Sequence, residues 1–438
     1  MTALKFSLSV VLGMALAAPA SAQVEHSDRK MHGLFGGSSR DPESRQSLDL
    51  SLSAYGAYDD DILADQRLTL DPRDRLSGLF TGMDGGMSYG RGGRNIDFGL
   101  SAGANARYFA DSHQFIFLGE QAGAGVTFHR QKTRLTMSGS GSYSPYFSLA
   151  PFPNAATAAS GLDPQDVTVV GELAPRPIDT IVQRRAAYGV GGGASFSQTL
   201  SAKSTFTATY STQQTRFVED DTKYNSQSGG ATVGYRVSRD LALHLGYLYG
   251  ENHFPGGLAP KFVTQTIDAG VDYSKALGLT RRTTFGFGVG TSAYQQNDSR
   301  TFHVVGDASL NHQMGRTWSA RAVYHRGVGF LQGFNTPYFA DSISALVGGT
   351  LSRRLDFRSE FAYTNGELGI AVRSNPFDVY TASARLRYAF SEMMAVYAEY
   401  AAYRYGFDST IVLPAGFPRE TYREGIRGGI TLWLPLVR

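Results

Sequence analysis

The chain has 438 residues, a formal net charge of +3 and no cysteine, which excludes disulfides, thiolate metal sites and a cysteine nucleophile. The small net charge gives no indication of nucleic-acid binding. Glycine occurs 51 times and aromatic residues make up 12% of the chain, a combination that favours a β-barrel or a propeller over an α/β enzyme.

The first segment, residues 1–22, has the pattern of a secretory signal peptide. Lys5 supplies a basic start, residues 8–17 form a short apolar core, and the sequence Ala-Ser-Ala at 20–22 precedes the expected cleavage site. The apolar core is too short for a spanning helix, which needs about 20 such residues. We therefore predict an exported protein, with a retained N-terminal anchor helix as the alternative. Residues 23–45 are polar and rich in glycine and serine, which predicts a flexible periplasmic tail.

From residue 46 onwards the sequence repeats short segments in which bulky apolar residues alternate with small or polar ones. Clear examples are the segments 46–58, 95–109, 284–294 and 394–407. A period of two predicts β-strands, and with the weaker segments included we expect about eighteen of them. No apolar run after the signal approaches the length of a spanning helix.

The connections between the predicted strands alternate strictly between short and long. Short connections, such as 239–240 and 353–354, alternate along the chain with longer polar ones, such as 147–184 and 331–340. Outer-membrane barrels have short periplasmic turns and long extracellular loops. We therefore predict a closed antiparallel transmembrane β-barrel of 16–18 strands over residues 46–438, all-β in class. A soluble antiparallel sandwich is the alternative.

The two faces of the predicted strands differ in chemistry. One face collects bulky apolar residues and the other collects charges, and an arginine at the lipid midplane would cost about 2–4 kcal/mol. We therefore expect the charged face to line a water-filled lumen and the bulky face to contact lipid. The expected lipid-facing residues include Leu241, Leu243, Leu245, Phe285 and Phe287. The expected pore-lining residues include Arg321, Arg358, Glu360, Arg385, Arg387, Glu399, Arg427, Asp268, Asp272 and Asp307.

Facing rows of opposite charge on the late strands would create a transverse field that orients and filters polar solutes. Mutual salt bridges that only stiffen the wall are the alternative. The mixture of charges favours no single ion.

The overall pattern resembles the Gram-negative outer-membrane porins, over about residues 46 to 438. The terminal stretch REGIRGGITLWLPLVR is similar to the last strand that the barrel-assembly machinery recognises in such proteins, although it lacks their final aromatic residue. Its LWLPL ending and its size resemble the β-barrel porins of exopolysaccharide-secretion loci. The resemblance implies an outer-membrane location, contacts with outer-membrane lipid, lipopolysaccharide and the assembly machinery, and, for the second group, periplasmic polysaccharide-export partners.

The longest connection, 147–184, is the third on the outer side. In porins the third loop often folds inward, so the resemblance implies a possible constriction loop, while a loop folded over the outer mouth is the alternative. Its candidate residues are Asp163, Asp166, Glu172 and Asp179.

The predicted function is an outer-membrane channel that passes hydrophilic solutes or saccharides through a charge-lined lumen. The alternatives are an exporter of exopolysaccharide that works with periplasmic partners, and an outer-membrane enzyme or structural barrel. None of the nine histidines lies in a short motif with a nucleophile, and no cluster has metal-ligand spacing. We therefore predict no catalysis, metal or cofactor.

Overall fold

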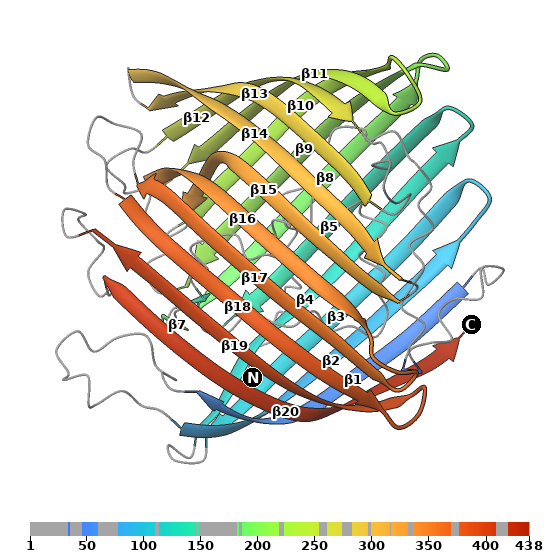
Figure 1. The fold of residues 1–438 in the computed structure, drawn as a ribbon, viewed down its shortest axis with the longest axis vertical. Coiled ribbons are helices and arrows are strands. Elements are labelled where there is room, and N and C mark those ends of the chain that lie inside the picture. The colour runs from blue at the N-terminus through green and yellow to red at the C-terminus, as the bar shows by residue number, and fades with distance from the viewer. Residues whose placement is uncertain are drawn as a thin grey trace, which may run out of the picture.

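The computed structural model forms one closed barrel of eighteen strands and a separate two-stranded sheet (Figure 1). The predicted fold class is confirmed, and the strand number lies at the upper end of the expected range. The residues that the structure describes are 34–35, 46–59, 78–109, 114–144, 147–148, 182–183, 186–218, 223–253, 261–273, 283–296, 299–315, 317–331, 336–368, 376–408 and 419–437.

The predicted signal peptide lies outside these residues. The barrel strands, in chain order, are β1 (Gln46–Asp59), β2 (Gly78–Gly92), β3 (Ile96–Phe109), β4 (Gln114–Arg130), β5 (Thr133–Ser144), β8 (Ala187–Thr199), β9 (Ser204–Phe217), β10 (Lys223–Arg236), β11 (Leu241–His253), β12 (Lys261–Tyr273), β13 (Thr283–Gln296), β14 (Ser299–Met314), β15 (Trp318–Leu331), β16 (Thr336–Thr350), β17 (Leu355–Leu368), β18 (Pro376–Ala389), β19 (Met394–Phe407) and β20 (Glu420–Val437). The separate sheet pairs β6 (Phe147–Ser148) with β7 (Val182–Gln183).

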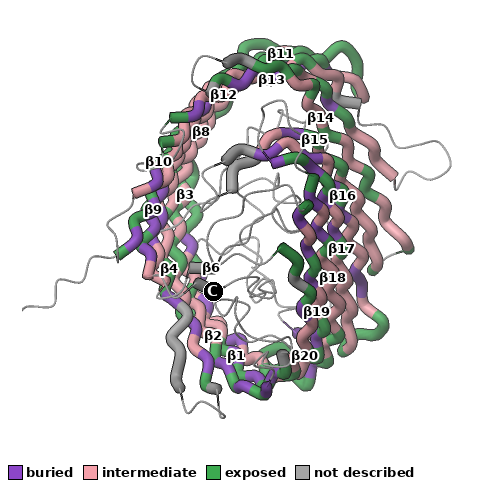
Figure 2. The backbone as a smooth tube through the Cα atoms, turned by 90° about the vertical axis from the view of Figure 1, so that its left-hand side faces the viewer, coloured by how far each residue is buried: buried purple, intermediate pink, exposed green. Residues whose placement is uncertain are grey.

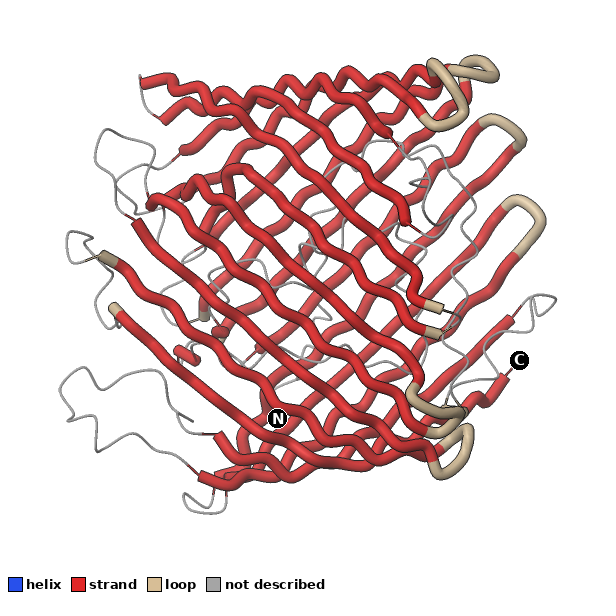
Figure 3. The backbone as a smooth tube through the Cα atoms, in the orientation of Figure 1, coloured by secondary structure: helices blue, strands red, loops and turns tan. Residues whose placement is uncertain are grey.

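Each barrel strand pairs antiparallel with its sequence neighbours, and β20 closes the barrel by pairing with β1. The closing ladder runs from Leu48 opposite Val437 to Asp59 opposite Gly425. Closure removes the exposed sheet edge, whose unpaired backbone groups lipid could not satisfy. Within the described residues, the barrel is built from strands and connecting turns (Figure 3). No described helix is long and apolar enough to cross a membrane.

Four turns at one end of the barrel share a serine that fixes the backbone. Ser201, Ser352 and Ser391 each accept a hydrogen bond at the side-chain oxygen from a backbone N–H three residues further on, at 3.0–3.1 Å. Ser238 does the same for the N–H two residues on, at 3.3 Å. These local bonds satisfy groups that a sheet ladder leaves open at its end, which is why short serine turns connect these strands. We call this end the tight-turn end and the opposite one the loop end.

Connection lengths follow the expected alternation except at three places. At the loop end, only four residues join β3 to β4 and only two join β13 to β14, whereas nine residues join β12 to β13 at the tight-turn end. The expectation of strict alternation is therefore wrong at these three connections. The short loop leaves β13 and β14 as a plain hairpin, paired from Thr283–His312 to Gln296–Ser299.

Candidate pore wall

The strand register places all the predicted pore-lining residues on one face of the wall. On the late strands, Arg358 lies opposite Arg385, Arg385 opposite Glu399, and Glu399 opposite Arg427. Because side chains directly opposite in a ladder point to the same face, the face can be followed strand by strand around the barrel. Asp272 joins it by its pairing with Ala242, although its side chain lies outside the described part of the structure.

Long side chains on this face reach past their neighbouring strands, as expected on a concave surface where side chains converge. Tyr397 on β19 lies 3.4 Å from the Ser53 hydroxyl on β1, with β20 between them. His244 on β11 extends over Gly270 of β12, close enough that a Cβ at Gly288 of β13 would lie 3.6 Å from its ring. The charged face is therefore the inner face.

The predicted lipid-facing residues occupy the opposite, outer face. Leu243 is 43% exposed, Leu245 60% and Phe287 37%, while Leu241 and Phe285 are partly covered. In contrast, His244, the inner-face residue between two of these leucines, is 5% exposed. Exposed and buried residues alternate in this way along many strands (Figure 2). Contact of the outer face with lipid remains a prediction.

Three ion pairs lie on the inner faces of β17–β20; we call this surface the arginine wall. The distances are 2.6 Å from Arg358 Nη2 to Glu360 Oε1, 2.9 Å from Arg387 Nε to Asp356 Oδ2, and 2.7 Å from Arg427 Nη2 to Glu399 Oε1. Two of the three pairs cross from one strand to the next, so they stiffen the wall, as one of the two readings of the sequence expected. With Arg385 and Arg423, the inner faces of these strands carry five arginines against three carboxylates, so the wall is net basic.

A second charged surface lies on β11–β14. His244 Nε2 stands 3.2 Å from Asp268 Oδ2, an ion-pair distance without hydrogen-bond alignment. Gly270 and Gly288 leave the room that the imidazole fills. Asp307 is exposed and lies opposite His325 in the next ladder. This surface therefore presents carboxylates, whereas the arginine wall presents guanidinium groups.

Most inner-face residues of β5, β8, β9 and β10 are short and uncharged, with exceptions near the strand ends such as Arg134, Arg236, Phe217 and Tyr224; we call this surface the hydroxyl–glycine wall. Ser140 lies opposite Gly191, and Thr209 lies opposite Gly230. Hydroxyls bond across strands, as between Ser211 and Ser228 at 2.7 Å. Short side chains take little volume, so this wall leaves space in the lumen.

Close to the loop end, the inner face becomes aromatic and closely packed. Phe377, Tyr405 and Phe262 are at most 2% exposed, although they share the inner face with the charged rows. Phe377 contacts Phe407 at 6.0 Å between ring centroids, and Tyr405 contacts Phe407 at 5.3 Å. The alternation of the sequence predicted water along the whole inner face, so this aromatic cluster was not predicted. The sequence does contain a signal for the cluster, because strand alternation places these rings on the same face as Arg385.

Two residues of the predicted N-terminal tail contact the inner wall at the tight-turn end. The Leu34 N–H donates a 2.7 Å hydrogen bond to the Arg353 carbonyl. Phe35 is 7% exposed and packs against Ala389, Ala395 and Trp433. The Arg387 guanidinium carbon lies 5.0 Å from the Phe35 ring centroid. These two residues are therefore docked, and flexibility remains a prediction for the other residues of 23–45, which lie outside the described part.

The candidate constriction residues lie outside the described part of the chain, as does nearly all of the 147–184 connection. Within the described residues, no group of three or more histidine, cysteine, aspartate or glutamate side chains is arranged to hold a metal ion. Leu34 and Phe35 were not predicted as contact residues. They form a short apolar pair in a polar segment that has no regular spacing.

No protein-family model matches the chain, and no curated protein matches it. Solved structures with a similar fold include OpdO from Pseudomonas aeruginosa, with 11% identity over 90% of this chain and 98% of that one, at a TM-score of 0.45. OccK2 (OpdF) from the same organism, solved in complex with glucuronate, has 10% identity over 90% and 98%, at 0.46. OccAB3 from Acinetobacter baumannii has 11% identity over 89% and 99%, at 0.43. The functional proposal for this chain rests on the chemistry of its own barrel wall.

Proposed function

We propose that the chain is an outer-membrane channel that admits hydrophilic solutes through a charge-lined lumen. The observation that carries the proposal is the sorting of charge around a closed barrel. The predicted pore-lining charges share the inner face, while exposed leucines and phenylalanines share the outer face. An apolar outer face suits lipid, and barrels of 16–18 strands enclose an aqueous channel.

The distribution of charge inside the lumen supports orientation of polar solutes in preference to selection of one ion. The arginine wall carries more arginines than carboxylates, and the β11–β14 surface carries Asp268 and Asp307. Opposite charges on two sides of one lumen produce a transverse field that aligns a dipolar solute.

The test is single-channel recording in planar bilayers. The refolded barrel is expected to give discrete conductance steps with weak ion selectivity. Removing two guanidinium groups with Arg358→Ala and Arg385→Ala should shift the reversal potential in a salt gradient towards cations. The matched control, Ser138→Ala with Ser140→Ala in the hydroxyl–glycine wall, should leave it unchanged. Absence of conductance steps from correctly folded barrels would contradict the proposal.

The partners predicted from the sequence, including lipopolysaccharide, the barrel-assembly machinery and polysaccharide-export components, remain predictions. Export of exopolysaccharide, which the LWLPL ending and the size of the chain imply by resemblance, also remains a prediction, and an exporter would need a periplasmic partner. Co-purification of the tagged barrel with periplasmic components would support that variant of the proposal.

A further inference from the structure

The barrel wall separates between β14 and β15 at the loop end. The ladder between these strands ends at Gly306 opposite Arg326, although β14 continues to Ser299 and β15 to Leu331. The flanking ladders do not end there. β13 pairs with β14 as far as Ser299, and β15 pairs with β16 as far as Leu331. Within the described residues, two intact hairpins therefore part from one another at this point.

Ring contacts show to which side of the β13–β14 hairpin the β15–β16 hairpin bends. Phe339 lies on the outer face of β16 with Asp341, whereas His303 lies on the inner face of β14 with Asp307. Their ring centroids are nevertheless 4.5 Å apart. An outer-face ring of one hairpin can meet an inner-face ring of the other only if the first hairpin lies inside the second. The loop ends of β15 and β16 lie inside the ring of the other strands in Figure 2.

The contact between the hairpins continues along a row of rings. His303 also lies 5.6 Å from Tyr294 on the inner face of β13, and Tyr294 stacks on Phe262 of β12 at 6.1 Å. On the other side of the row, the Arg326 guanidinium carbon lies 5.0 Å from the Phe339 ring centroid. The hairpin thus contacts His303 of β14, which belongs to a row of rings that continues through β13 to β12.

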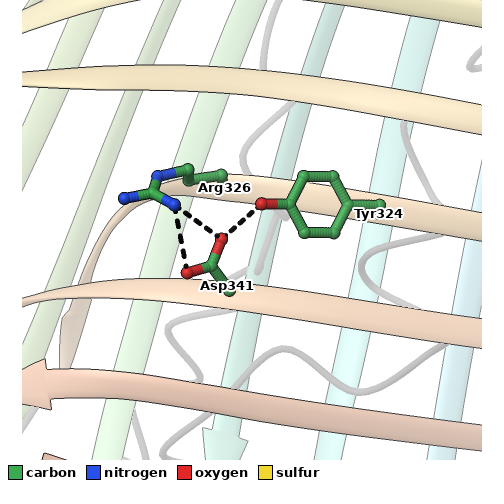
Figure 4. A network of polar contacts seen from close by, with 3 residues as sticks. All are labelled: Tyr324, Arg326 and Asp341. Atoms are coloured by element: carbon green, nitrogen blue, oxygen red, sulfur yellow. Dashed lines mark hydrogen bonds and ion pairs between the residues drawn. The ribbon is translucent and has the colours of Figure 1, made fainter.

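A polar network keeps the hairpin itself rigid (Figure 4). Arg326 on β15 approaches both carboxylate oxygens of Asp341 on β16 at 3.5 Å, and the Tyr324 hydroxyl donates to the same carboxylate. All three side chains lie on the outer face of the two strands. They tie β15 to β16 beside the last residue that still pairs with β14, so the hairpin bends as one unit.

The local sequence explains why the bend occurs where it does. Gly327 directly follows Arg326, the last β15 residue that pairs with β14, and Gly329 comes two residues later. Glycine inside a strand weakens it and often marks a bend or a close approach of backbones. At Gly306, a Cβ would lie 2.7 Å from the Gly288 carbonyl oxygen, so β14 is also held to β13 by a close backbone approach there.

We propose that the β15–β16 hairpin is a constriction element at the loop end of the lumen, latched by the stack of Tyr294, His303, Phe339 and Arg326. This inference rests on the proposed channel and names the segment that controls how polar solutes enter it. A solute that enters from the loop end passes the hairpin before it reaches the arginine wall. Constriction is thus provided by a strand hairpin, independently of the long 147–184 connection.

The position of the hairpin is tested by cross-linking, for which a chain without cysteine is suited. The pair His303→Cys and Phe339→Cys should be joined by a short bifunctional thiol reagent in folded barrels. The pair Val304→Cys and Val328→Cys, which would face each other if the β14–β15 ladder continued, should form no disulfide on oxidation. The control pair Leu310→Cys and Ala322→Cys lies in the existing ladder and should oxidise. Oxidation of the 304–328 pair like the control, without a 303–339 cross-link, would overturn the proposal.

The constricting role is tested by conductance. Phe339→Ala removes the ring between His303 and Arg326 and should raise the single-channel conductance. The control, Ile343→Ala, changes an exposed outer-face residue of the same strand outside the stack and should leave conductance at the parent value. Unchanged conductance in Phe339→Ala would overturn the constriction. A barrel that cross-links as expected but never conducts would instead refute the proposed channel.

Discussion

The arginine wall on β17–β20 and the hydroxyl–glycine wall on β5, β8, β9 and β10 have the same antiparallel ladder geometry but opposite inner-face chemistry. On the first, long charged side chains are bound into pairs such as Arg427–Glu399. On the second, serine, threonine and glycine face one another, and Ser211 bonds to Ser228. The backbone therefore sets only which residues face inward. The inward residues decide whether a sector projects charge or leaves space.

The two walls also differ in the stability that is lost when one side chain is removed. A buried ion pair is costly to break because the remaining partner is left as an uncompensated charge. A neutral hydroxyl contributes about 0.5–1.5 kcal/mol through a hydrogen bond and leaves no charge behind when it is removed. We therefore expect single substitutions to destabilise the arginine wall more than the hydroxyl–glycine wall.

The largest difference is expected between Glu399→Ala and Ser140→Ala, which remove side chains that are each 4% exposed. Glu399→Ala leaves the Arg427 guanidinium without its carboxylate and should lower the free energy of unfolding by about 3–5 kcal/mol. Ser140 Oγ has no hydrogen-bond partner within the described residues, so its removal should change stability by less than about 1 kcal/mol. Denaturant unfolding of the refolded barrel measures both values.

The double variant Glu399→Ala with Arg427→Ala is the control for charge. It should recover much of the stability that Glu399→Ala loses, because no unpaired guanidinium remains. Equal losses in the single and double variants would show that packing, and not charge pairing, dominates this part of the wall.

An intermediate effect is expected from Phe35→Ala, which acts where the N-terminal segment adds a partner to the arginine wall. Burial of a phenylalanine side chain stabilises a contact by about 1.5–3 kcal/mol. Because the variant removes this stabilisation, the N-terminal segment should lose its contact with the wall. The chain has two tryptophans, and a Trp318→Phe background leaves Trp433, which packs on Phe35, as the reporter. Its emission should shift to the red and become more accessible to acrylamide. Met393→Ala, at an exposed turn position nearby, should leave the emission unchanged.

The smallest effect is expected from Ser211→Ala in the hydroxyl–glycine wall. The change removes one 2.7 Å hydroxyl pair with Ser228 and should cost about 0.5–1.5 kcal/mol. Single-channel conductance should stay at the parent value because neither charge nor much volume changes. A conductance change as large as that of an arginine substitution would show that the two walls do not differ as described.

The period-two pattern was sufficient to predict the barrel, a strand number of about eighteen and the common face of the ten assigned charged residues, because alternation is a local property of each strand. In the pair Leu245 and His244, for example, neighbouring residues could be assigned to opposite faces from the sequence alone. The inward hairpin could not be predicted in this way. It depends on where the β14–β15 ladder stops, which is set by contacts such as His303–Phe339 between segments that are separated in the sequence.

The docked N-terminal pair was missed for a related reason. Leu34 and Phe35 lie in a polar, glycine-rich segment without periodicity, and their binding site is assembled from the turn between β16 and β17 and from residues of β18, β19 and β20. Ion pairing in the arginine wall was only partly predictable. The sequence indicated which charges share a face, but the choice of partners, such as Arg387 with Asp356 instead of Glu360, follows from the register.

The central claim is that the barrel is apolar towards lipid and hydrated inside. The most direct test attaches spin labels to Leu245→Cys on the outer face and to Asp307→Cys on the inner face, in barrels refolded into lipid bilayers. Collisional relaxation should show that oxygen, which concentrates in hydrocarbon, reaches the label at 245, whereas a water-soluble nickel complex reaches the label at 307. Equal access of the nickel complex to both labels, or the reverse preference, would contradict the account.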